Sequence, residues 1–399
     1  MNMRWAAAVI ATAVLALAAG CGSSSSTSSS GSSGGVKAPA GPKAPTKLGA
    51  GEGQVNLIAW AGYAEDGSTD PKVDWVTPFE KKTGCNVNVK IGNTSDEMVT
   101  LMRTGKYDLV SASGDATLRL IAGGDVAPVN TDLVSNYADV YSGLKNQPWN
   151  SVDGKMYGIP HGYGANLLMW RLDKVKGKLD SWSAVFDQAA QNKGRVTAYD
   201  SPIYIADAAL YLKATKPELK IDNPYELDTK QFDAAVALLK TQRQSIGQYW
   251  ADYTKEQAAF SSGDSTVGTT WQVIANLLGA DKVPVRTILP KEGSTGWSDT
   301  WMIASKAQHP NCAYEWMNWI ISPKTNAQVA EWFGEAPANQ KACAQTADKS
   351  HCKTFHAGDS SYYDRVAFWT TPRAQCGDSR GNTCVDYSKW AQAWTEIKG

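Results

Sequence analysis

The sequence predicts an α/β fold that contains two units of mostly parallel sheet. Residues 55–115 alternate apolar runs of strand length with short amphipathic runs, a pattern typical of parallel βαβ units. A second block of the same kind covers about residues 165–295, and a further apolar strand follows it. Two such blocks, separated by two strand-like crossings, fit a fold with two lobes better than one large domain.

The first crossing is expected within the stretch from Gly158 to Trp170. Its second half, from residue 165 onward, is a short apolar run typical of a buried strand. Its first half contains residues that let a backbone bend or pass close to another group, namely Gly158, Pro160, Gly162 and Gly164. The alternative is an ordinary loop that leads into a core strand, and the rest of the chain favours the crossing.

The first unit is expected to contain three strands and two helices. The strands cover residues 55–60, 86–91 and 107–111. One helix is expected from Asp70, as the N-cap before Pro71, to Gly84, and the other from Ser95, as N-cap, to Gly105. Ligands bind parallel sheets at the carboxyl ends of the strands. The residues expected at that edge are Trp60, Tyr63, Ser111, Ser113 and Asp115.

The second block is expected to contain three helices and three strands. The helices cover residues 181–191, 205–213 and 228–245, and the strands cover residues 195–200, 265–271 and 285–289. Two of these strands end at Asp200 and Trp271, although Asp200 is equally well interpreted as a helix N-cap. The chain then returns through a strand at residues 296–303, where Trp297 and Asp299 would point to the same face, to helices at 310–321 and 326–333.

The N-terminus predicts export and a lipid anchor. Arg4 precedes an apolar run that is too short for a comfortable transmembrane helix and is typical of a signal peptide. Ala18-Ala-Gly-Cys21 resembles the lipobox of bacterial lipoproteins, with alanine where leucine is usual, which implies lipidation of Cys21. The alternative is an unlipidated secretory signal. Residues 22–53, rich in Ser, Gly, Ala and Pro, are expected to form a flexible tether.

Six cysteines remain in the body, and an even number in an exported chain suggests disulfides. Short loops favour Cys343–Cys352 and Cys376–Cys384, which leaves Cys85–Cys312 as a long-range link. Cys352 also lies between His351 and His356, a spacing that could bind a metal. We expect a disulfide-closed loop with surface histidines there, and no metal.

Charge and motifs exclude several classes of function. Lys+Arg and Asp+Glu both number 39, so the formal net charge of zero argues against a nucleic-acid-binding protein. The chain has no Gly-x-Ser-x-Gly, His-Glu-x-x-His or Walker sequence, and Gly162-x-Gly164 lacks the third glycine of a dinucleotide fingerprint. We therefore expect neither enzymatic activity nor a cofactor.

The candidate pocket residues combine flat aromatic side chains with carboxylates. Aromatic faces accept methylene groups and cations, whereas carboxylates pair with ammonium groups. A long, flexible, amine-terminated alkyl chain would match both features. Most of the 16 tryptophans, taken singly, are better explained by core packing. The residues that carry the hypothesis are the aromatic Trp60, Tyr63, Trp271, Trp297 and Trp369 and the acidic Asp115, Asp200 and Asp299.

Several spaced motifs resemble the spermidine/putrescine-binding proteins of bacterial ABC importers. They are Trp60-x-x-Tyr63, Tyr107-Asp-Leu-Val-x-x-Ser113, Lys155-x-Tyr-Gly-Ile-Pro160 and Trp297-x-Asp299. The likeness covers about residues 55–340. It implies a two-lobed periplasmic-binding-protein fold of type II, which closes on a polyamine. It also implies that the cleft is lined by Trp60, Tyr63, Ser113, Asp200, Trp271, Trp297 and Asp299.

The chain departs from this family at four pocket positions. Asp115 stands where the family has an aromatic residue, and the glutamate expected just after Asp200 is missing. Gly334-Glu335 stands where a pocket tyrosine is expected, and Thr370, beside Trp369, replaces a glutamine. These departures bear on which amine is bound, so a quaternary amine or an amino-acid derivative is the alternative ligand.

The resemblance implies a monomeric, membrane-anchored protein that delivers its ligand to an ABC permease on the outer face of the cell membrane. We expect a signal peptide at residues 1–20, lipidated Cys21 with a tether to residue 54, one lobe at 55–160 and 299–345, a second lobe at 161–298, and a disulfide-containing C-terminal segment at 346–399 that packs on the body. A secreted hydrolase and a surface adhesin are the alternatives from other classes.

Overall fold

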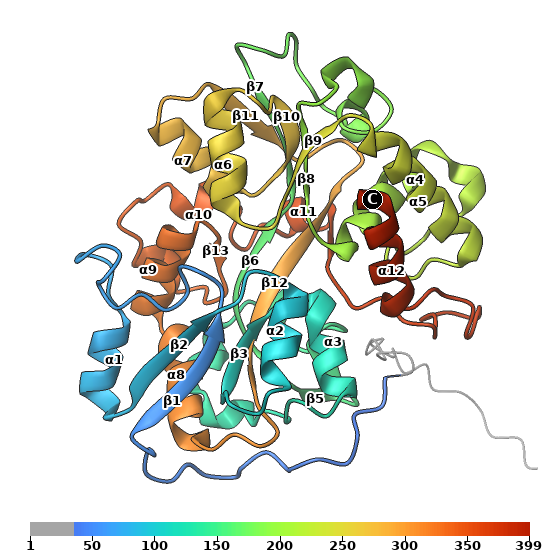
Figure 1. Cartoon of the computed structure of the whole chain (residues 1–399). Helices are drawn as coiled ribbons and strands as arrows, with labels where there is room; N and C mark the ends of the chain where they lie inside the picture. The colour runs from blue at the N-terminus through green and yellow to red at the C-terminus, as the bar shows by residue number, and fades with distance from the viewer. Residues whose placement is uncertain (1–35) are drawn as a thin grey trace, which may run out of the picture. The chain divides into compact units, whose positions relative to one another are not determined.

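The computed structural model describes residues 36–399, whose strands form two large sheets and one short hairpin (Figure 1). The predicted signal peptide and the predicted lipidation of Cys21 lie outside the described residues. The first sheet has the strand order β13-β6-β12-β3-β1-β2, with β14 beside β12. The second has the order β11-β7-β10-β8-β9. This two-lobed α/β arrangement is the fold that the sequence predicted.

The first sheet begins with three parallel strands, as expected from the βαβ pattern. They are β1 (Gln54–Ala59), β2 (Asn86–Ile91) and β3 (Leu109–Ala112). The strands β6 (Ile159–Ala165), β12 (Ser294–Ile303), β13 (Ala336–Pro337) and β14 (Val366–Phe368) complete it. Its helices are α1 (Val76–Thr83), α2 (Ser95–Met102), α3 (Gly114–Ala122), α8 (Pro310–Ile320) and α9 (Pro323–Phe333).

The second sheet is formed largely by the middle of the chain. Its strands are β7 (Leu167–Arg171), β8 (Val196–Tyr199), β9 (Ile246–Trp250), β10 (Val267–Thr270) and β11 (Val285–Ile288). Its helices are α4 (Ile205–Thr215), α5 (Thr229–Arg243), α6 (Tyr253–Ser262), α7 (Gln272–Ala280) and the C-terminal α12 (Tyr387–Lys398). In Figure 1, α12 lies beside α5, and Lys240 and Arg243 of α5 contact Glu396 and Lys398.

Smaller elements complete the described part of the chain. They are the hairpin of β4 (Ser151–Val152) and β5 (Lys155–Met156) and the one-turn helices α10 (His351–Thr354) and α11 (Ser360–Tyr363). The sequence did not predict α3, α6, α7, α12 or β9. No helix among residues 36–399 is both long enough and apolar enough to cross a membrane.

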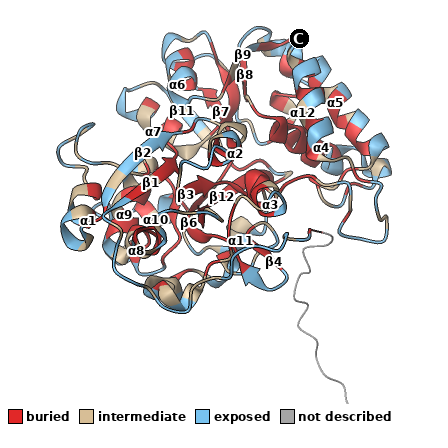
Figure 2. Ribbon diagram, turned by 60° about the horizontal axis from the view of Figure 1, so that its bottom comes forward, coloured by how far each residue is buried: buried red, intermediate tan, exposed pale blue. Residues whose placement is uncertain are grey.

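Two hydrophobic cores correspond to the two sheets. One surrounds the first sheet and includes Phe79, Trp301 and Trp316. The other surrounds the second sheet and includes Trp170 and Trp390. Figure 2 shows β3, β6 and β12 coloured as buried, and every residue of β12 is buried. The strands that pass between the two cores are therefore shielded from solvent.

Glycines in β6 and directly before it make room for neighbouring side chains, as the sequence suggested for the crossing. A Cβ on Gly162 would lie 2.0 Å from the carboxyl carbon of Glu335, and one on Gly164 would lie 2.8 Å from the Trp297 ring. A Cβ on Gly158 would lie 2.6 Å from the Thr300 hydroxyl. Real side chains do not approach so closely, so these positions need glycine.

Three local predictions are wrong. The first helix begins at Val76 and not near Pro71. Asp70 accepts only from the Lys72 amide, in a short turn that precedes the helix. The buried Trp75, directly before the helix, donates its indole N–H to the Tyr63 carbonyl. The second helix is capped by Thr94, whose hydroxyl accepts from the Glu97 amide, and it ends at Met102.

Residues 181–191, predicted as an α-helix, form two 3₁₀ turns, Trp182–Ala184 and Ala189–Asn192. Contacts with a distant loop favour these turns. The Trp182 indole donates to the Gly293 carbonyl at 2.9 Å, and the Ser181 hydroxyl donates to Glu292 at 2.5 Å.

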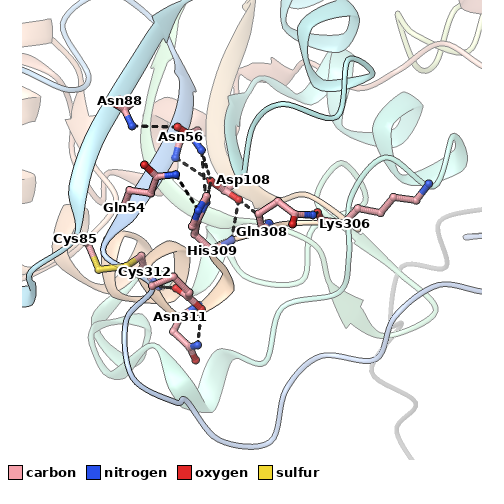
Figure 3. Close-up of polar contacts among 11 residues, drawn as sticks. Gln54, Asn56, Cys85, Asn88, Asp108, Lys306, Gln308, His309, Asn311 and Cys312 are labelled. Carbon is pink, nitrogen blue, oxygen red and sulfur yellow. Dashed lines mark hydrogen bonds and ion pairs between the residues drawn. A yellow bond between two sulfur atoms is a disulfide. The ribbon is translucent and has the colours of Figure 1, made fainter.

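The predicted tether is not free along its whole length, because its final part contacts the first lobe. Asn311 and the Cys312 amide donate to the carboxylate of Glu52, and the Gly49 amide donates to the Asn311 side chain. Figure 3 shows the neighbouring contacts, in which the buried Asp108 accepts hydrogen bonds from the amides of Asn56 and His309. Residues 49–52 are thus held against the start of α8.

Three disulfides link Cys85 to Cys312, Cys343 to Cys352 and Cys376 to Cys384, the set that the short spacings favoured. The first ties the segment between α1 and β2 to α8, as Figure 3 shows. Cys352 is therefore not a thiolate ligand, and no group of three or more potential metal ligands occurs in the part of the chain that the structure describes.

Candidate functional site

A small cavity lies where the two sheets meet. Its free volume is about 10 Å³, room for no more than one water molecule. Six of its lining residues were predicted for the site, and one of these, Ser113, is the N-cap of α3. The lining is Trp60, Ser113, Tyr199, Trp271, Trp297, Asp299, Phe333 and Trp369.

Ends of elements supply the aromatic walls. Trp60 follows β1, Trp271 follows β10, and Phe333 ends α9. The Trp271 and Trp297 rings meet edge to face at a centroid distance of 6.3 Å, and Trp297 and Phe333 do the same at 5.8 Å. The rings contact one another across the junction of the lobes, so the aromatic box is closed.

Asp299 is the carboxylate of this cavity. The Ser113 hydroxyl donates to its Oδ1 at 2.5 Å, and the Tyr63 hydroxyl lies 2.8 Å from its Oδ2. Burial raises the pKa of the Asp299 carboxyl to about 7, although both hydrogen bonds favour the charged form. Trp297 and Asp299 both line the cavity, as their spacing in one strand predicted.

Behind the cavity, Tyr63 joins Asp299 to a second buried carboxyl group. Its hydroxyl lies 2.9 Å from Oε2 of Glu335, which follows α9 and packs over Gly162. Burial, followed by the charge of Asp299, raises the pKa of Glu335 well above its usual range. His161 of β6 lies 4.0 Å from Oε1 of Glu335, and burial lowers the His161 pKa to about 3.

Two predicted carboxylates do not line the cavity. Asp200 accepts hydrogen bonds from the Trp394 indole at 2.9 Å and from the Lys398 ammonium at 2.7 Å, both on α12. Asp115 is fully buried in the first turn of α3, where its Oδ1 accepts from the Ser95 hydroxyl and its Oδ2 has no hydrogen-bond partner. Burial raises the pKa of Asp115 to about 6. Ser111 is buried within β3.

The C-terminal segment closes one side of the cavity through Trp369. Its amide donates to the Gly296 carbonyl at 2.7 Å, and its ring stacks on Tyr199 at a centroid distance of 5.6 Å. A Cβ on Gly114 would lie only 1.8 Å from the Trp369 carbonyl oxygen, so glycine is needed where this segment meets α3. The segment beyond residue 345 thus contributes to the site.

Sequence reasoning did not select Tyr199, Phe333 or His161. Tyr199 stands directly before Asp200 at the end of β8, a strand end that the sequence predicts for the site, but Tyr199 and not Asp200 faces the cavity. His161 lies inside the crossing stretch, whose prediction rested on its glycines and proline and not on the histidine. Phe333 ends a helix whose position was predicted, but nothing in its spacing points to the cavity.

A wider hollow elsewhere is not the candidate site. It has a volume of about 870 Å³ and lies between residues 38–44 and the segments around Val126, Met156 and Lys306. Its walls lack the combination of aromatic faces with a buried carboxyl group. The small cavity has that combination, so it can recognise a cation attached to an apolar stem.

A family model described as bacterial extracellular solute-binding protein matches residues 74–354. The chain is 24% identical over 294 residues to spermidine/putrescine-binding periplasmic protein 1 of Haemophilus influenzae, across 72% of this chain and 76% of that protein.

Solved structures show the same fold. A lipoprotein of Treponema pallidum has a TM-score of 0.69 at 16% identity and covers 86% of this chain and 99% of its own. The spermidine/putrescine ABC transporter substrate-binding protein of Streptococcus pneumoniae has a TM-score of 0.66 at 17% identity, across 86% of this chain and 98% of its own.

Proposed function

The chain belongs to the bacterial extracellular solute-binding proteins, and we propose that it captures a linear polyamine of the spermidine/putrescine class and delivers it to an ABC permease. In this proposal the protein acts as a monomer and carries out no chemical conversion. The ligand binds between two lobes, one built on the first sheet and the other on the second sheet.

The observation that carries the proposal is a buried carboxyl group inside an aromatic box. Asp299 shares its cavity with Trp271 and Trp297, and one ammonium group of the ligand would pair with it. The methylene stem would lie against the two indole rings, where burial and cation–π attraction contribute roughly 0.5–2 kcal/mol for each good contact.

The second ammonium group needs another acceptor. Asp115 is our candidate because its Oδ2 is buried and has no hydrogen-bond partner, and because its charge acts on both Asp299 and Tyr199. Asp200 is the less favoured candidate, since the Lys398 ammonium already pairs with it at 2.7 Å.

Binding requires the lobes to separate. The cavity of about 10 Å³ is far too small for a diamine, so the aromatic rings must move apart before a ligand enters. We propose that the motion is a hinge rotation at the two crossings, between β6 and β7 and within β12. Asn166 lies at the first crossing and donates to the Thr295 hydroxyl at the second, at 2.6 Å.

Calorimetry with putrescine and spermidine tests the proposal. We expect saturable binding that weakens with added salt, because the attraction between charges is screened. 1,4-Butanediol, which keeps the stem and lacks the charges, is the matched control and should not bind. If neither amine binds at high concentration, or if the diol binds equally well, the polyamine proposal is wrong.

We also propose that Cys21 carries a lipid that anchors the body to the outer face of the cell membrane. The support is the Ala18-Ala-Gly-Cys21 sequence. In a bacterial host, the protein should partition with membranes, and Cys21→Ala should release or mis-process it. Unchanged membrane association of the variant, at unchanged mass, would contradict the anchor.

A further inference from the structure

The carboxyl groups of Asp299 and Glu335 share one phenol. The Tyr63 oxygen lies 2.8 Å from Asp299 and 2.9 Å from Glu335, both within hydrogen-bond distance. A phenol has a single hydrogen, so it donates to only one of the two groups. The other contact requires a carboxyl O–H that donates to the Tyr63 oxygen. The geometry therefore calls for one carboxyl proton in the free pair.

The groups around the pair offer no balancing positive charge. His161 faces Glu335 from β6, and neither of its ring nitrogens has a hydrogen-bond partner; burial lowers its pKa to about 3, so it is neutral. Asp115 faces from α3 and Tyr199 from β8. Tyr363 of α11 lies within electrostatic range of Glu335, and His351 of α10 contacts the Glu335 carbonyl at 2.8 Å.

We propose that the pair of Asp299 and Glu335 retains one proton in the free protein and that an ammonium group bound at Asp299 expels it. This inference rests on the proposed function and adds to it the release of one proton for each ligand bound. The protonated pair and the ammonium group combine to give an ammonium ion beside two carboxylates, and the proton passes to solvent. Glu335 acts through Tyr63 and is a positioning residue.

The pH dependence follows from the order in which the pair loses its protons. Burial raises the pKa of Asp299 to about 7 and that of Glu335 well above its usual range, so both shifts favour the single retained proton that the two contacts at Tyr63 call for. A bound cation lowers both values. Affinity should then rise by up to about tenfold per pH unit above about pH 7. Below that pH, protonation of Asp299 weakens binding further.

Calorimetric titration with putrescine near pH 8, in buffers of different ionisation enthalpy, measures the protons released for each ligand bound. We expect about one proton for the wild-type protein. Glu335→Gln keeps the size of the side chain and an N–H that can donate to Tyr63, but it removes the second carboxyl group. It should therefore release almost none and lose the rise in affinity above about pH 7.

Glu256→Gln is the matched control, because Glu256 is also a fully buried carboxyl group, on α6 of the other lobe, and burial raises its pKa well above the usual range. It should release protons as the wild type does. Binding without proton release in the wild type overturns the inference alone, and so does equal release by Glu335→Gln. Absence of binding by the wild type overturns the proposed function and this inference with it. If Glu335→Gln does not fold, the wild-type measurement decides.

Discussion

The Asp299 carboxyl group is buried in the free protein, 3% exposed, with only neutral hydroxyl donors at its oxygens. Burial disfavours its charged form and raises its pKa to about 7. An ammonium group would reverse this cost, because a cation placed beside the carboxylate stabilises the charge. Burial of this carboxyl group therefore lowers the stability of the free protein and at the same time favours the binding of a cationic ligand.

Asp299→Asn should separate binding from stability. The amide keeps the size of the side chain and an acceptor for Ser113, but it leaves a ligand ammonium without its carboxylate, at a cost of roughly 3–5 kcal/mol. Putrescine binding in calorimetry should nearly vanish, while the thermal unfolding temperature near neutral pH stays equal or rises. Asp233→Asn, on the exposed face of α5, is the control and should bind as the wild type does. Unchanged binding by Asp299→Asn would contradict the assigned role.

At the scale of elements, the crossing strands β6 and β12 hold the site. Trp297 packs over Gly164, and Glu335 packs over Gly162. The strands pair through this region, with a register shift between Asp299 and Thr300. Because neighbouring side chains occupy the space above each glycine, the position of the pocket depends on the absence of a Cβ in β6.

Gly162→Ala should disturb the carboxyl pair. The new methyl group would lie 2.0 Å from the buried Glu335 carboxyl carbon, which must move. We expect a loss of about 1–3 kcal/mol in the free energy of unfolding, together with weaker putrescine binding. Gly143→Ala is the control, because a Cβ at Gly143, in the short turn Ser142–Leu144, has no neighbouring atom within 4 Å. Denaturant unfolding of both variants checks the difference, and equal stability would show that Glu335 relaxes without cost.

A second element-scale feature is a polar chain that joins α4 to both crossings. Trp271 donates to Asn166 at 3.0 Å, Asn166 donates to the Thr295 hydroxyl at 2.6 Å, and that hydroxyl donates to Asp207 at 2.9 Å. Asp207 lies on α4, and burial raises its pKa to about 7. This chain orients the Trp271 ring that forms one wall of the cavity.

Asp207→Asn should change the pH dependence of stability. The folded-state pKa of about 7 lies above the unfolded value, so Asp207 contributes stability at low pH and loses it as pH rises from about 4 to about 7. The asparagine variant lacks this loss. Its unfolding temperature relative to the wild type should therefore increase over that pH range and then level off. A difference that is independent of pH would show that Asp207 is ionised in the folded protein.

At the scale of the whole molecule, distant parts of the chain meet at the site and at the disulfides. The Cys85–Cys312 bond spans 227 residues and joins the first βα units to α8 of the returning segment. The C-terminal segment crosses between the lobes, with Trp369 at the cavity and α12 on the second core. The segment that contains α8 thus completes the first lobe, and the C-terminal segment completes the cavity and the second core.

The long disulfide should contribute more to stability than the shortest one. Closing a longer loop restricts the unfolded chain more, so we expect the Cys85→Ser/Cys312→Ser protein to lose about 2–5 kcal/mol in the free energy of unfolding. The Cys376→Ser/Cys384→Ser protein, which opens a bridge with a sequence separation of 8, should lose less. Denaturant unfolding compares them, with free-thiol labelling as the check that the wild-type body has no reactive thiols. The reverse order would contradict the loop argument.

Local pattern determined much of this protein. Strand alternation and short βα loops predicted the class of fold, the spacing of Trp297 and Asp299 placed both on one face of a strand, and short cysteine spacings indicated two disulfides. These features depend on residues that are close together in the sequence, so they can be predicted from the sequence alone. The tertiary structure alone decided that Asp200 pairs with Lys398 and that Tyr63 joins Asp299 to Glu335. Those partners are 198, 236 and 272 residues apart, and only packing of the folded chain brings them together.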